Sequence, residues 1–125
     1  MTRRNAALAA AVAATALAGC GGSSNKQLSY SDFISKANKV CADGNAELAN
    51  VNDAKQAGKI LDKYVQKFKD LTPPDKLKPE YDQFVSVSEQ QVEKLNAGDF
   101  EAANALGPKS NEIAAKMGAQ ECVSG

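Results

Sequence analysis

Apolar residues recur every three or four positions along most of the chain after residue 28, a spacing that places them on one face of an α-helix. The first series predicts a helix over residues 31–51, with Ser31 as its N-cap and Gly44 as a weak point in its middle. A second series predicts a helix that Asp53 caps and that extends to about residue 71, where Thr72-Pro73-Pro74 stops it.

Two further helices follow the same rule. The third begins with Pro79, whose fixed backbone suits a first helical turn, and ends at Ala97-Gly98, where glycine accepts a left-handed cap. Asp99 is expected to cap the fourth helix and Gly118 to end it. Gly107-Pro108 should break or kink this last helix, because proline lacks an amide donor and clashes with the preceding turn.

No run of alternating β-branched residues competes with these helices, and their short connections make neighbouring helices antiparallel. We therefore predict an all-α fold, an antiparallel four-helix bundle formed by residues 29–125.

The first twenty residues follow a different pattern, that of a secretory signal. Arg3 and Arg4 precede a run of small apolar residues from 6 to 19, which is shorter than the roughly 20 residues that cross a membrane. Leu17-Ala18-Gly19-Cys20 resembles the lipobox of bacterial lipoproteins. The resemblance implies that residues 1–19 are cleaved, that Cys20 carries a diacylglycerol, and that the protein lies at the extracytoplasmic face of the cell membrane.

Two alternatives to this interpretation remain open. The segment could be an ordinary cleaved signal in which the cysteine is incidental, and the paired arginines also raise twin-arginine export in place of the general secretory route. Gly21–Gln27 is rich in glycine and serine, so we expect residues 20–28 to form a flexible tether between the lipid and the bundle.

The number of cysteines is consistent with an exported protein. The chain has three, and once Cys20 carries the lipid, Cys41 and Cys122 remain as a pair that should be oxidised outside the cytoplasm. In an up-down-up-down bundle the last helix finishes near the start of the first, so one disulfide can close the bundle. The alternative is two independent thiols or a metal pair, but no histidine or further cysteine completes a zinc set, and we expect no metal.

The charges are nearly balanced. The chain has 15 Lys and Arg and 15 Asp and Glu, and without Arg3 and Arg4 the mature segment has a small acidic excess, which argues against nucleic-acid binding. One helix carries a lysine stripe: Lys55, Lys59, Lys63 and Lys67. The simpler interpretation is a solvated face that complements the acidic helix after it. The functional one is docking onto anionic lipid headgroups or wall polymers.

Residue types also limit the chemistry. Without histidine there is no Ser-His or Cys-His dyad, so we expect neither an enzyme nor a cofactor. Glu89 and Glu93 lie one turn apart, as in a calcium site, but this spacing more often marks a solvated face. The seven aromatic residues are expected to pack in the core, although a ligand cavity among the small residues remains an alternative.

The mature segment, about residues 30–123, is similar to small exported helical lipoproteins with two cysteines from high-GC Gram-positive bacteria. The likeness rests on four short stretches: Lys39-Val40-Cys41-Ala42, Leu71-Thr72-Pro73-Pro74, Asn96-Ala97-Gly98-Asp99, and Met117-Gly118 with Cys122. It implies an architecture with an uninterrupted last helix, and no site residue carries over from it.

These observations favour a non-enzymatic module, anchored by the lipid on Cys20, that interacts with or scaffolds an envelope protein. The alternative is a carrier that holds a small apolar or lipidic ligand between its helices. These two hypotheses differ in whether the domain contains an internal site.

Overall fold

The computed structural model describes residues 26–124. The predicted signal peptide (1–19), the lipid carrier Cys20 and residues 21–25 of the tether lie outside this range. Within it the chain is helical and contains no strand. The elements are α1 (Tyr30–Leu48), α2 (Ala54–Lys69), the 3₁₀ turn η1 (Asp75–Leu77), α3 (Lys78–Asn96), α4 (Phe100–Ala105), α5 (Gly107–Met117) and the 3₁₀ turn η2 (Gln120–Cys122).

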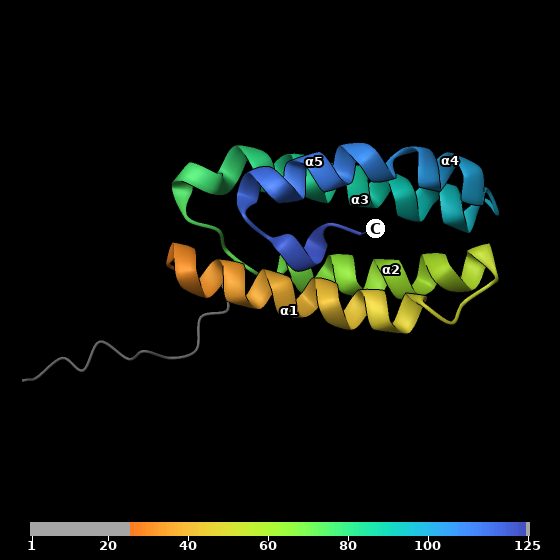
Figure 1. Cartoon of the computed structure of the whole chain (residues 1–125), viewed down its shortest axis with the longest axis horizontal. Coiled ribbons are helices and arrows are strands. Elements are labelled where there is room, and N and C mark those ends of the chain that lie inside the picture. The colour runs from red at the N-terminus through yellow and green to blue at the C-terminus, as the bar shows by residue number, and fades with distance from the viewer. Residues whose placement is uncertain (1–25, 125) are drawn as a thin grey trace, which may run out of the picture.

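The helices form two layers (Figure 1). Helices α1 and α2 lie side by side in one layer, and α3 lies beside α4 and α5 in the other, while the contact between α2 and α3 joins the layers. The turn η2 lies between the layers and contacts both α1 and α5. A disulfide between Cys41 and Cys122 fixes η2 to α1, which confirms the predicted pairing.

Side chains cap three of the helices. Asp53 accepts a hydrogen bond from the Gln56 amide at 2.8 Å, and Asp99 accepts one from the Ala102 amide at 2.9 Å, as predicted for both. The prediction for the first helix was wrong at both ends. Ser29, not Ser31, is its N-cap, and the helix stops at Leu48, three residues before the predicted end.

Glycine and proline set the remaining boundaries. Gly98 and Gly118 have φ angles of 82° and 86°, the left-handed conformation that ends α3 and α5. The predicted fourth helix is divided into α4 and α5 at Leu106, directly before Gly107-Pro108. The expected break is therefore confirmed, and the last helix departs from the uninterrupted one that the lipoprotein resemblance implies.

The core has two parts of different character. One is aromatic: Phe33 packs edge-on against Phe68 and Tyr81, and Phe68 also contacts Phe84. The other lies at the α4 end of the molecule and is built from small residues, namely Ala54, Ala57 and Ala103 with Leu95. We expected all seven aromatic residues to pack in the core, but two of them, Tyr30 and Phe100, are exposed.

The residues before α1 are bonded to the domain. The Leu28 amide donates to the carbonyl of Thr72 at 2.9 Å, and the Gln27 side chain donates to Asp75 at 3.0 Å. We expected the tether to extend to residue 28, but these bonds attach its last two residues to the loop after α2 and to the start of η1.

Candidate functional site

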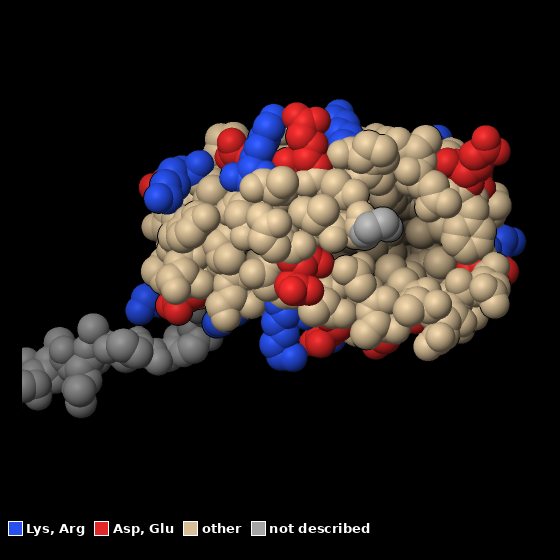
Figure 2. All heavy atoms as spheres, in the orientation of Figure 1, with Lys and Arg blue, Asp and Glu red and all other residues tan. Residues whose placement is uncertain are grey.

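A cleft of about 590 Å³ lies between the two helical layers. Figure 2 shows it as a hollow beside the C-terminus, with the ends of α1 and α2 on one side and α4 on the other. Its lining is mostly apolar and comes from every helix: Val40, Cys41, Leu48, Val51, Leu61, Tyr64, Val65, Phe68, Phe84, Val85, Leu95 and Phe100 are among the residues that face it. The surface around the hollow is largely uncharged (Figure 2).

The cleft exists because the turns that face it carry small side chains. Helix α1 contributes Gly44, Ala49 follows directly after α1, and α4 contributes Ala103. Gly44 is buried against Tyr64, and a β-carbon at Gly44 would lie 3.0 Å from Tyr64 Cγ, closer than ordinary contact. The absent side chain therefore lets Tyr64 pack on α1 and form one wall.

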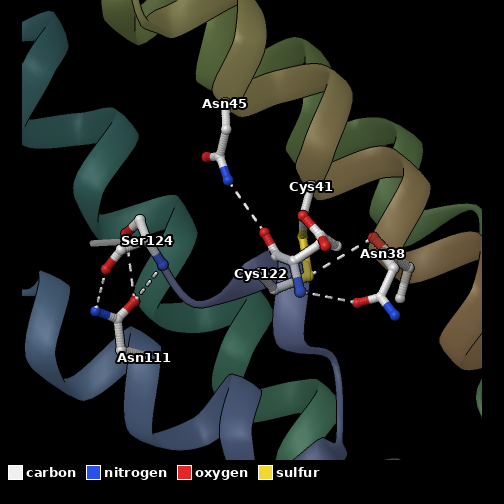
Figure 3. The surroundings of a disulfide bond; sticks show 8 residues. Asn38, Cys41, Asn45, Asn111, Cys122 and Ser124 are labelled. Carbon is white, nitrogen blue, oxygen red and sulfur yellow. Dashed lines mark hydrogen bonds between the residues drawn. A yellow bond between two sulfur atoms is a disulfide. The ribbon is translucent and has the colours of Figure 1, made fainter.

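The C-terminal strap, residues 119–124, closes one side of the cleft. Figure 3 shows how it is held on α1: beside the disulfide, the Asn45 side chain donates to the Glu121 carbonyl, and Asn38 Oδ1 accepts from the Glu121 amide, both at 3.1 Å. On α5, the Asn111 side chain donates to the Ser124 carbonyl at 2.7 Å and accepts from its amide at 3.0 Å. The strap thus bridges the layers, and residues 121–124 line the cleft.

A few neutral polar side chains also line the cleft. Ser88 of α3 and Ser110 of α5 are buried, with 5% and 7% of their surfaces exposed. Gln91 follows Ser88 by about one helical turn and donates a hydrogen bond to the Ala103 carbonyl at 3.3 Å. Among the described lining residues, only Glu121 is charged at neutral pH, and Glu121 is exposed to solvent.

A hydrogen-bonded group lies behind the Tyr64 wall. Glu47 accepts hydrogen bonds from Lys63 and from the Tyr64 hydroxyl, both at 2.7 Å. The bond from Lys63 is the main reason why the pKa of Glu47 is lowered, and the bond to Glu47 raises the pKa of Tyr64 to about 12. These contacts join α1 to α2 and hold the tyrosine ring at the cleft.

The lysine stripe lies on α2 outside the cleft. Lys63 is bonded to Glu47, and the ammonium groups of Lys63 and Lys67 lie 4.9 and 4.8 Å from the centre of the Tyr64 ring. Lys55 and Lys59 are exposed. Of the four lysines, Lys63 therefore has a partner on α1, and Lys67 contacts a ring of α2 itself. The predicted complementarity between α2 and α3 is seen in another pair, Lys69 and Glu89, at 3.3 Å.

Glu89 and Glu93 are exposed on the outer face of α3, beside a shallow acidic groove. Residues 26–124 contain no group of three or more side chains arranged to hold a metal ion. None of the helices in the same range is long and apolar enough to cross a membrane.

No protein-family model, curated protein or solved structure matches the chain. The candidate site therefore rests on its own geometry. The sequence predicted small residues in the first and last helices and the return of the segment that carries Cys122 to Cys41. It did not predict the cleft or the bonds of the strap to α5, since both depend on contacts between residues that no local pattern pairs.

Proposed function

We propose that the protein is a lipid-anchored, extracytoplasmic binding protein that holds a small apolar ligand in the cleft. The domain would be an antiparallel four-helix bundle whose fourth member is divided into α4 and α5. Cys20 would carry the lipid, and the short segment before Gln27 would keep the cleft near the membrane, where apolar ligands are concentrated.

The observation that carries the proposal is the cleft itself. Its volume of about 590 Å³ lies within the range of roughly 300–1,000 Å³ that is typical of small-molecule sites. Protein interiors are normally close-packed, and apolar surface that faces water is unfavourable. A ligand that fills the cleft would cover this surface, so the cleft favours the carrier over the module that the sequence alone favoured.

The rim of the cleft has features that fit a second function, interaction with another protein. Phe100 and Val123 line it, and each has 37% of its surface exposed. Exposed apolar side chains beside a hollow are also the features that an apolar side chain of an envelope protein would contact. The interaction module is therefore the competing proposal, and one experiment addresses both.

The test is native mass spectrometry of the protein purified from its own host. A stoichiometric small molecule supports the carrier, whereas a co-purified protein without a small molecule supports the interaction module. A matched pair of variants locates the site: Asn104 lines the cleft and the adjacent Ala105 does not, although both are exposed on α4. Asn104→Trp should lose the ligand and Ala105→Trp should keep it. Equal retention by both variants would exclude the cleft as the binding site.

A further inference from the structure

The described lining of the cleft contains no cation, in a protein whose surface is rich in charge. Lysine and arginine together make up 15 residues of the chain, yet none of the described lining residues is a cation. The one carboxylate among them, Glu121, belongs to the strap and would repel an anion. An anionic group that entered the cleft would lose its hydration without gaining a positive partner, which is costly.

The cleft does offer neutral hydrogen-bonding groups. Ser88 and Ser110 belong to neighbouring helices that contact each other, and both are buried where they line the cleft. A serine hydroxyl can both donate and accept a hydrogen bond, and the side-chain amide of Gln91 adds one group of each kind. Such groups suit an uncharged oxygen, as in an alcohol or an ester.

We propose that the cleft selects a neutral amphiphile, with one apolar chain and an uncharged hydroxyl or ester group, against the corresponding fatty-acid anion. This inference rests on the proposed function and names the class of its ligand. The apolar chain covers the surface contributed by residues such as Leu61 and Phe84, and the neutral oxygen meets the hydroxyls of Ser88 and Ser110.

The first experiment compares two ligands of equal chain length, 1-decanol and decanoate. Each is titrated into the full mature domain with 1-aminoanthracene, an uncharged fluorescent probe, and displacement of the probe is measured. At pH 8 we expect decanol to displace the probe at a concentration at least about tenfold lower than decanoate. The difference should shrink near pH 4, where the carboxylate becomes protonated.

The outcomes separate the two proposals. If decanoate competes as well as decanol at pH 8, the selectivity for a neutral ligand is wrong while the binding function stands. If the probe and both ligands fail to bind, the proposed function itself is wrong.

A matched pair of variants tests the cause of the selectivity. Gln91→Lys places a cation in the cleft, whereas Gln90→Lys makes the same charge change at the adjacent exposed position outside it. We expect Gln91→Lys to improve displacement by decanoate about tenfold at pH 8 and Gln90→Lys to leave it unchanged. Equal responses of the two variants would contradict the proposal.

A milder substitution keeps the test valid if lysine at position 91 prevents folding. Ser110→Ala removes one hydroxyl and no other heavy atom, so the apolar volume is nearly preserved. It should weaken binding of decanol several-fold, because decanol loses a hydrogen bond, whereas we expect the largely apolar probe to retain its binding. Unchanged affinity for decanol in both Ser110→Ala and Ser88→Ala would overturn the role of the hydroxyls.

Discussion

Tyr64 shows how single residues set the shape of the cleft. Its ring packs on the bare backbone of Gly44, its hydroxyl donates to Glu47, and two lysine ammonium groups lie over its ring. Each contact comes from a different chemical property of the ring: its flat apolar face, its polar tip and its negative electrostatic surface. The combined effect is one fixed orientation for a side chain that forms a wall.

Replacing Glu47 with glutamine should lower the pKa of Tyr64 from about 12 toward its ordinary value of 10. The reason is that the bond from the tyrosine hydroxyl to the carboxylate is the main cause of the raised pKa. NMR titration of tyrosine labelled at the ring carbon beside the hydroxyl resolves Tyr64 from the other two tyrosines. Tyr81, whose pKa is raised chiefly by burial, serves as the internal control and should not respond.

The same substitution should change how stability depends on pH. Because the pKa of Glu47 is lowered on folding, its contribution is present above about pH 4.5 and is lost as the pH falls below it. The pKa of Tyr64 is raised, so its contribution is lost as the pH rises from 10 to about 12. Glu47→Gln should reduce both losses in urea unfolding, whereas Glu112→Gln, in an exposed pair within α5, should not. Identical pH profiles for the wild type and Glu47→Gln would contradict this account.

At the residue scale, the sequence predicted what depends on near neighbours. Asp53 and Asp99 cap their helices, and Gly98 and Gly118 end theirs, because each acts on backbone groups a few positions away. The sequence contains a signal that favours Ser29 over Ser31 as the N-cap of α1, and the prediction missed it. Asp32 follows Ser29 by three residues, which is the spacing of a capping pair. No local sequence signal indicates the contact between Gly44 and Tyr64, because this contact joins two different helices.

At the scale of the elements, the helix pattern could be predicted but the cleft could not. Apolar periodicity identified every main helix, and Gly107-Pro108 identified the division between α4 and α5. Periodicity shows which face of a helix is buried, but it does not show whether the facing side chains meet. Small residues on two facing helices can let those helices approach each other, or they can leave a gap between them. Here a gap remains: α1 packs on η2, and the cleft beside this contact is also lined by Ala103 of α4.

The lysine stripe gives a prediction that belongs to α2 as a whole. Changing Lys55, Lys59, Lys63 and Lys67 together to glutamine should weaken binding of the unlipidated domain to vesicles that contain anionic phospholipid, most clearly at low salt. Each basic residue near an anionic surface contributes about 1 kcal/mol, and salt screens this attraction. Vesicle co-sedimentation measures the effect.

The control variant has the same net charge as the stripe variant but leaves the stripe intact. In it, four other lysines are changed to glutamine: Lys36, Lys94, Lys109 and Lys116. It should bind better than the stripe variant if the arrangement of lysines on α2 matters. Equal loss in both variants indicates attraction by net charge alone. Failure of the wild type to bind at low salt excludes docking through the stripe.

At the scale of the whole molecule, the disulfide joins the two ends of the domain and the two layers. Cys41 lies in α1, Cys122 lies in the strap after α5, and 81 positions separate them in the sequence. The strap is also held on α5 by Asn111, so the same short segment fastens both layers and forms one side of the cleft. Stability and the shape of the candidate site therefore depend on one structural feature.

Replacing both cysteines with serine should lower the free energy of unfolding by about 4.5 kcal/mol. Cross-linking residues so far apart restricts the unfolded chain, and the chain-entropy relation gives this value for a loop of such length. It is a large part of the roughly 5–15 kcal/mol that keeps a domain folded. Urea unfolding measures the change, and hydrogen exchange should show faster opening of the strap on the α1 side.

Asn111→Ala provides the comparison that isolates the covalent contribution. It removes the side chain that holds Ser124 on α5, and each exposed hydrogen bond of this kind contributes only about 1 kcal/mol. The cysteine variant should therefore lose clearly more stability than Asn111→Ala, although both release one end of the same strap. If the two losses are equal, the disulfide acts only as a local fastening of the strap, and closure of the long loop contributes little to the stability of the fold.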